Sequence, residues 1–321
     1  MSVDDLAAGT RKHQKYEALI ARAKTVQPAA TLVVHPCDAA SLSATCEAAL
    51  EGLIDPILVG PKAKIARAAE KAELDIEAFE LVDVEHSEAA AAKAVELVHQ
   101  AKGGLLMKGS LHTDELMRAV TASSTGLRTA RRISHVFVMD VPTYPETLII
   151  TDAAINIFPD LDAKKDIIQN AIDLFLDLGV GEPRVAILSA VETVTAKIPS
   201  TIEAAALCKM AERGQIVGGV LDGPLAFDNA ISPEAAAMKG IQSAVAGRAQ
   251  ILVVPDLEAG NMLAKNLTFL AEADAAGLVL GARVPIVLTS RADSVRSRLA
   301  SCAVAVLLAD ARKRKKAGAI S

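Results

Sequence analysis

Short apolar runs alternate with longer segments of mixed apolar and polar residues along the first 130 or so residues. Four of these runs predict β-strands, over residues 31–34, 56–59, 79–82 and 104–107. Helices are predicted between them, for example over residues 62–71 and 88–102. This alternation is typical of a parallel sheet that is covered by helices on both faces.

The rhythm changes after Arg132. Strands are predicted over residues 136–139 and 147–151, and the Tyr144-Pro145-Glu146 break leaves no room for a helix between them. We therefore expect this pair to be antiparallel, as a hairpin or arm. Alternation then resumes, with strands predicted over residues 184–188, 216–221, 250–254 and 286–289 and helices over 164–178, 200–213, 257–272 and 292–313.

Length and composition favour a protein of two lobes. The chain has 321 residues, of which 51% are hydrophobic and only 2% aromatic, with no Trp. The core must therefore be built from Ala, Leu, Ile and Val, which suits helices packed closely on a sheet.

Charge and targeting features exclude several classes of protein. The formal net charge of −5 and the pI near 5.8 argue against nucleic-acid binding. The basic run at residues 312–316 is either a solvated helix end or a local anion contact. The four cysteines form no C-x-x-C pair, so we expect reduced thiols and no metal site. The acidic N-terminus lacks a signal peptide and no apolar run reaches the ~18 residues of a membrane span, so we expect a cytoplasmic protein.

Polar and glycine-rich residues follow several of the predicted strands, where ligands of open α/β sheets bind. The segments are Lys108-Gly109-Ser110, Asp222-Gly223-Pro224, residues 255–261 and residues 289–293. In the last of them, Ser290 and Arg291 precede a helix whose free N–H groups and partial positive charge favour an anion. The alternative, that Ser290 or Asp293 only caps the helix, stays open.

The other segments also have two interpretations. Gly260 would cost an α-helix about 1 kcal/mol relative to Ala, which indicates close approach of either a ligand or another helix. Residues 222–224 are most simply a turn after a strand, and the lone His112 and His135 are more often structural than ligands. Metalloprotease, serine hydrolase, P-loop and Rossmann motifs are absent from the sequence.

Taken together, the motifs resemble the phosphate acetyltransferase and phosphate butyryltransferase family. They occur in family order from about residue 100 to 305, whereas the first hundred residues match only in length and rhythm. The segments that carry the resemblance are 106–109, 116–118, 132–137, 151–156, 188–192, 222–228, 254–261 and 289–294. The resemblance implies a three-layer α/β/α fold of the isocitrate and isopropylmalate dehydrogenase type. Residues 1–132 with 282–321 would form one lobe and 133–281 the other, with the active site in the cleft between them, in a homodimer.

The resemblance also implies the reaction: reversible transfer of a short acyl group between coenzyme A and inorganic phosphate, by direct attack of the thiolate on an acyl phosphate. Such a reaction needs a base for the thiol, donors for the oxyanion and cations for the phosphate. Ser290 matches the family serine that stabilises the transition state, and Arg291 and Arg118 match its phosphate-binding arginines. We expect the remaining substrate contacts from Lys108, Gly109, Asp256, Gly260 and Asn261. Coenzyme A would be a substrate, and no bound cofactor or metal is expected.

One departure from the family pattern concerns the base. Acetyl-specific members carry an Asp seven residues after the serine, but Ser297 stands there in this chain, and Asp293 is the nearest carboxylate. The Ser-Arg-Ala-Asp-Ser segment leans toward the butyryl type without fixing the acyl chain. The alternatives are a metal- and NAD-dependent 2-hydroxy acid dehydrogenase of related fold and a non-catalytic coenzyme A-binding relative.

Overall fold

The computed structural model describes residues 13–288 and 293–318. Their internal contacts divide them into two compact units. The terminal unit comprises residues 16–131 and the described residues from 276 onward, and the central unit comprises residues 13–15 and 132–275. The lobe boundaries given above stay a prediction.

The terminal unit is a mixed α/β structure. Its strands follow the order β3-β2-β1-β4-β11-β10. All neighbouring pairs for which the register is known are parallel except β10 with β11. The strands are β1 (Ala29–Val34), β2 (Ile54–Gly60), β3 (Glu80–Asp83), β4 (Leu105–Lys108), β10 (Asp274–Leu280) and β11 (Ile286–Val287). The helices are α2 (Gln14–Ala23), α3 (Ala39–Leu50), α4 (Lys62–Lys71), α5 (Ser87–His99), α6 (Thr113–Thr121) and α12 (Val295–Gly318).

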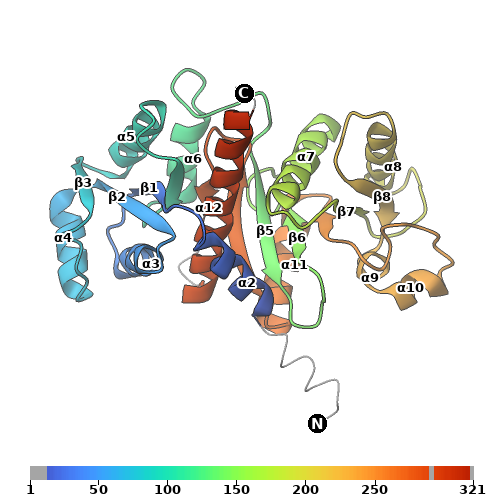
Figure 1. Cartoon of the computed structure of the whole chain (residues 1–321). Coiled ribbons are helices and arrows are strands. Elements are labelled where there is room, and N and C mark those ends of the chain that lie inside the picture. The colour runs from blue at the N-terminus through green and yellow to red at the C-terminus, as the bar shows by residue number, and fades with distance from the viewer. Residues whose placement is uncertain (1–12, 289–292, 319–321) are drawn as a thin grey trace, which may run out of the picture. The chain divides into compact units, whose positions relative to one another are not determined.

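The helices of the terminal unit cover both faces of its strands, as the sequence predicts. Figure 1 shows α3 and α4 on one face of β1–β3 and α5 and α6 on the other. Helix α12 contacts α3, β4 and β11. Its middle is buried on all sides, from Ala300 to Ala309, which explains why the hydrophobic pattern there has no polar face.

Strand register aligns three strand ends of the terminal unit. Val34 at the end of β1 pairs with Lys108 at the end of β4, and Val287 at the end of β11 pairs with Met107. Because β1 and β4 are parallel, the residues that directly follow them lie at the same edge of the sheet. Lys108 and Gly109 therefore lie beside the end of β1.

The central unit is built on strands in the order β5-β6-β9-β7-β8. The predicted antiparallel pair is confirmed as β5 with β6, and the other pairs are parallel. The strands are β5 (Ser134–Asp140), β6 (Leu148–Thr151), β7 (Arg184–Leu188), β8 (Val220–Leu225) and β9 (Ile251–Val253). The helices are α7 (Leu161–Asp177), α8 (Pro199–Glu212), α9 (Phe227–Ile231), α10 (Pro233–Met238) and α11 (Leu257–Leu270).

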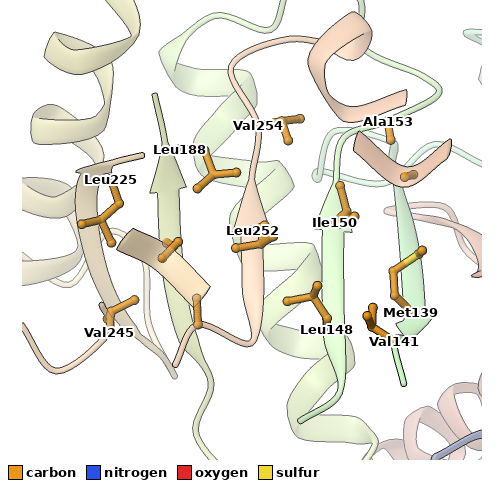
Figure 2. Close-up of a cluster of buried hydrophobic side chains, with 14 of the residues drawn as sticks. Met139, Val141, Leu148, Ile150, Ala153, Leu188, Leu225, Val245, Leu252 and Val254 are labelled. Atoms are coloured by element: carbon orange, nitrogen blue, oxygen red, sulfur yellow. The ribbon is translucent and has the colours of Figure 1, made fainter. Parts of the chain in front are cut away.

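An aliphatic core joins the sheet of the central unit to the helices on one face. Leu148, Ile150, Leu188 and Leu252 point from the strands into this cluster, which is shown in Figure 2. Alanines of α9, α10 and α11 close it from the other side: Ala230, Ala236 and Ala264. The scarcity of aromatic residues thus leads to a core of small side chains that lets helices approach the strands closely.

One predicted strand is displaced in the structure. The strand expected over residues 216–221 is β8, Val220–Leu225, so Asp222-Gly223-Pro224 lies within a strand and is not a turn after it. Proline is tolerated there because β8 is at the end of the strand order, where a backbone N–H need not pair on the outer side. Strand β10 was not predicted, since its Asp-Ala-Ala-Gly start hides the short apolar run that follows.

Candidate active site

Lys108 and Gly109 lie at the carboxyl end of β4, directly beside the end of β1. The Gly109 N–H donates to the Val34 carbonyl at 2.9 Å. A Cβ on Gly109 would lie 2.6 Å from the His35 carbonyl oxygen, so only glycine fits at this place. Lys108 is half-buried, and its Nζ donates to the Gly109 carbonyl at 3.2 Å. The need for glycine is therefore set by the backbone of β1.

A polar cluster that sequence reasoning missed is formed by His35, Ser110 and Cys37 at the same edge. His35 Nδ1 is 3.1 Å from Ser110 Oγ, which donates to the His35 carbonyl at 2.8 Å and accepts from the Cys37 N–H at 3.2 Å. With the hydroxyl proton directed at the carbonyl, Nδ1–H donates to Oγ and Nε2 is the acceptor nitrogen of the ring.

Two further properties distinguish this cluster. The backbone of His35 is in the left-handed region, with φ of 55°, which is uncommon for a residue other than glycine. Burial, assisted by the Lys64 charge, lowers the pKa of His35. Burial raises the pKa of the Cys37 thiol to about 11, so this thiol is not an activated nucleophile. The sequence shows that a strand ends at His35-Pro36, but it does not show that Ser110, 75 residues away, is the partner of His35.

The segment with Ser290 and Arg291 lies outside the described residues, which resume at Asp293. Ser294 caps α12, because its Oγ accepts the Ser297 N–H at 3.1 Å. Arg298 donates to the Asp293 carbonyl at 2.9 Å and to the Ala40 carbonyl at 3.1 Å. The cap of α12 is thus supplied by Ser294, the residue after Asp293.

Arg118 lies on α6 and its side chain is 68% exposed. Its Nη1 is 3.2 Å from Glu88 Oε1 on α5, and its Nη2 is 3.9 Å from Asp114 Oδ2 on its own helix. These partners are exposed as well, so the ion pairs are of the weak surface type. Breaking these ion pairs would therefore cost little free energy.

Asp256, Gly260 and Asn261 begin α11 in the central unit. Asp256 caps the helix by accepting the Ala259 N–H at 2.9 Å. A Cβ on Gly260 would lie 2.9 Å from the Asp152 carbonyl oxygen, and Asn261 Nδ2 donates to the Ala153 carbonyl at 3.2 Å. Of the two interpretations of Gly260, the structure shows close packing against protein, here against residues 152–153.

The segment that α11 packs against contains a buried carboxylate. Asp152 is only 3% exposed and accepts four hydrogen bonds, from the N–H groups of His135, Ala154 and Ile155 and from Asn156 Nδ2. Such a carboxylate holds the loop after β6 in one conformation. Asp152 and Asn156 belong to a motif that carries the family resemblance, but their sequence spacing alone does not reveal this network.

The predicted site residues therefore fall into local groups within the units. Lys108 and Gly109 lie together at the end of β1, and Gly260 and Asn261 lie against residues 152–153. Within the described residues, the ion pairs of Arg118 are with Glu88 and Asp114.

Residues 13–288 and 293–318 contain no group of three or more His, Cys, Asp or Glu side chains that could hold a metal ion. Within the same ranges, no helix combines the length and the apolar character needed to cross a bilayer.

Comparison with known proteins decides the family. Residues 87–306 match the family model described as "Phosphate acetyl/butaryl transferase". The chain belongs to this family of acyltransferases. The resemblance inferred from the ordered motifs is thereby confirmed, and the dehydrogenase alternative is not favoured.

Similar proteins cover nearly the whole chain. A phosphate acetyltransferase of Rhizobium meliloti is 73% identical over 306 residues, which are 95% of this chain and 97% of that protein. A phosphate butyryltransferase of Clostridium acetobutylicum is 40% identical over 92% of this chain and 98% of that protein. Among solved structures, a branched-chain phosphotransacylase from Enterococcus faecalis V583 has a TM-score of 0.76 at 29% identity, covering 87% of this chain and 99% of that one.

Proposed function

We propose that this protein catalyses the reversible transfer of a short acyl group between coenzyme A and inorganic phosphate. The observation that carries the proposal is its membership of the acyltransferase family over residues 87–306, with relatives matched over almost their full length.

In the direction of acyl-CoA formation, the thiolate sulfur of coenzyme A attacks the carbonyl carbon of an acyl phosphate. The bond between this carbon and the phosphate oxygen then breaks, and phosphate leaves with the electron pair. We propose Ser290 as the donor that stabilises the oxyanion and Arg291 and Arg118 as phosphate ligands. We propose Asp293 as the base that takes the thiol proton.

We propose acetyl as the preferred acyl group, with butyryl as the second choice. The relative named phosphate acetyltransferase is 73% identical, whereas the one named phosphate butyryltransferase is 40% identical. This weighs against the lean toward the butyryl type that Ser297 suggests. One methylene is worth only about 1–3 kcal/mol in a pocket, so a few side chains are enough to change the preference.

Several finer features are proposed on the resemblance alone. They are the fold type of the isocitrate and isopropylmalate dehydrogenases with a cleft active site, a homodimeric assembly, a cytoplasmic location, and turnover without a bound cofactor. We also propose five further residues as contacts of the substrates: Lys108, Gly109, Asp256, Gly260 and Asn261. The capping and packing contacts described above hold the backbone around them in place.

The test is thiol release from acyl-CoA, followed with 5,5'-dithiobis(2-nitrobenzoate). We expect release from acetyl-CoA only when phosphate is present, with arsenate able to replace it. Parallel assays with propionyl-, butyryl- and crotonyl-CoA give the acyl preference. Lack of phosphate-dependent release from any of these thioesters, or activity that needs a nicotinamide cofactor, would contradict the proposal.

A further inference from the structure

Arg132 is an exposed residue whose backbone is nevertheless fixed on both sides. It precedes β5 in the central unit. Its N–H donates to Asp166 Oδ2 at 2.9 Å, and its carbonyl accepts from Asn170 Nδ2 at 2.8 Å. Both partners come from α7, so the start of the Arg132 side chain has a fixed position on the central unit.

The Arg132 side chain is fixed as well, by Asn156. The Nε–H donates to Asn156 Oδ1 at 2.8 Å, and Asn156 is only 5% exposed. Asn156 Nδ2 donates to the Ile133 carbonyl at 2.9 Å and to Asp152 Oδ2 at 2.6 Å. Both of these groups are acceptors, which fixes the amide orientation and directs Oδ1 at the arginine.

This arrangement leaves the outer edge of the guanidinium available. Neither Nη1 nor Nη2 of Arg132 makes a hydrogen bond or an ion pair with any residue of the described ranges. Asp152 does not neutralise the Arg132 charge directly, because the Asn156 amide lies between them. The result is a cation held through Nε, with Nη1 and Nη2 left to donate to a ligand.

A surface arginine without a ligand gains little from such support, because holding a long side chain in one conformation costs entropy. A planar fork held in advance loses less entropy when it binds a phosphate, which it matches geometrically. All the substrates of the proposed reaction carry phosphate groups. The support of Arg132 therefore has the form expected of a phosphate-binding site.

We propose that Arg132 binds a phosphoryl oxygen of a substrate through Nη1 and Nη2, and that Asn156 is a positioning residue for it. This inference rests on the proposed acyl transfer. The same chemistry is offered by inorganic phosphate or acyl phosphate and by the phosphate groups of coenzyme A. The kinetics below distinguish these sources.

The experiment compares Arg132→Gln, Arg132→Lys and Asn156→Ala, with Arg213→Gln as the matched control. Arg213 is also an exposed arginine of the central unit, at the end of α8. Its side chain makes no hydrogen bond or ion pair with the residues that the structure describes. Initial rates are measured with phosphate varied at saturating acetyl-CoA, with acetyl-CoA varied at saturating phosphate, and with acetyl-dephospho-CoA. Thermal melts accompany each variant.

We expect Arg132→Gln to raise the KM for one substrate by roughly tenfold or more, with kcat and melting temperature close to wild type. Lysine should recover part of this loss, since it keeps the charge without the fork. Asn156→Ala should raise the same KM although the arginine is present. A defect in phosphate KM identifies inorganic phosphate as the ligand. A defect in acetyl-CoA KM that disappears with the dephospho substrate identifies the 3′-phosphate, and one that persists identifies the diphosphate.

The inference is overturned if both KM values of Arg132→Gln stay within twofold of the Arg213→Gln control. It is also overturned if the melting temperature falls while both KM values rise equally, because that pattern describes a structural anchor. If the wild type has no transferase activity, the proposed function fails by itself. The role of Arg132 is then tested by ligand-induced stabilisation. Phosphate or coenzyme A should raise the melting temperature of the wild type but not that of Arg132→Gln. Equal shifts in the two proteins overturn the inference.

Discussion

The carbonyl oxygen of Asp152 occupies the place next to Gly260 where a larger residue would have its side chain. An ideal Cβ on Gly260 would lie 2.9 Å from this oxygen and 2.8 Å from Val254 Cγ2. The Val254 methyl can rotate away, but the Asp152 backbone cannot move freely because its carboxylate is held by four hydrogen bonds. Helix α11 and the loop after β6 therefore fit together only with glycine at this position.

Gly260→Ala should lower the free energy of unfolding. Overpacking costs about 1–3 kcal/mol, which exceeds the gain of up to about 1 kcal/mol that Ala brings to a helix. Chemical denaturation of the variant measures the net loss. Gly104→Ala is the control, because the nearest atom to its ideal Cβ is 3.9 Å away. Unchanged stability together with raised substrate KM values would instead mean that Gly260 makes room for a ligand.

His135 should make the protein sensitive to acid. Burial, opposed by the Asp152 charge, lowers the pKa of His135 from 6.5 to about 4, and its Nδ1 has no hydrogen-bond partner among the described residues. Between these two pH values the unfolded chain binds a proton that the folded chain does not. The free energy of unfolding should therefore fall as the pH decreases from 6.5 to 4, by at most ~1.4 kcal/mol per pH unit from this group.

The test for His135 is denaturation of the wild type and His135→Gln at several pH values. The variant is expected to be less stable at neutral pH, since it loses the edge-on contact of the ring with Phe137. Its stability should, however, depend less steeply on pH below 6.5. Parallel curves for the two proteins would mean that other groups cause the acid sensitivity.

Arg118→Gln should affect phosphate binding far more than stability. The exposed pair with Glu88 contributes under ~1 kcal/mol to folding, whereas a charge-assisted bond to phosphate contributes about 1.5–3 kcal/mol. We expect an increase in phosphate KM of roughly 10- to 150-fold and a nearly unchanged melting temperature. Glu88→Gln is the matched control, because it breaks the same pair but should leave the phosphate KM equal or lower. Equal small effects of both variants would show that Arg118 serves only the surface pair.

Much of the fold could be predicted from the sequence because many elements have clear chemical boundaries. Strand β7, Arg184–Leu188, and helix α4, Lys62–Lys71, were predicted to the residue. The displaced β8 shows the limit: Gly223-Pro224 has the composition of a turn, and only the position of the strand at the end of the sheet makes it acceptable there. Composition identifies strand breakers but does not show which strands lie at an edge.

The candidate site was predictable only in part, for a similar reason. The rule that ligands bind beyond the carboxyl ends of strands drew attention to Lys108, Gly109 and Gly260. At Gly109 and Gly260, a neighbouring backbone comes so close that only glycine fits. It could not identify the bond between His35 and Ser110 or the support of Arg132 by Asn156, because these residues are far apart in the chain. Strand order and register bring such partners together, and a single sequence does not specify them.

The last prediction separates the roles of Asp293 and Ser294, which are neighbours at the start of α12. Ser294 Oγ accepts the Ser297 N–H at 3.1 Å, so Ser294→Ala should cost about 1 kcal/mol of stability and have little effect on kcat. If Asp293 is the base, Asp293→Asn should lower kcat by ~10²–10⁴-fold, with smaller changes in KM and a melting temperature near that of the wild type. The change to Asn keeps the backbone carbonyl of residue 293, which accepts a hydrogen bond from Arg298. Loss of this hydrogen bond therefore cannot explain a change in kcat. Initial-rate kinetics and thermal melts of the two variants supply the comparison. A near-normal rate in Asp293→Asn would remove this carboxylate from the chemistry, and a variant that loses stability as Ser294→Ala does would show that Asp293 helps to hold the helix start.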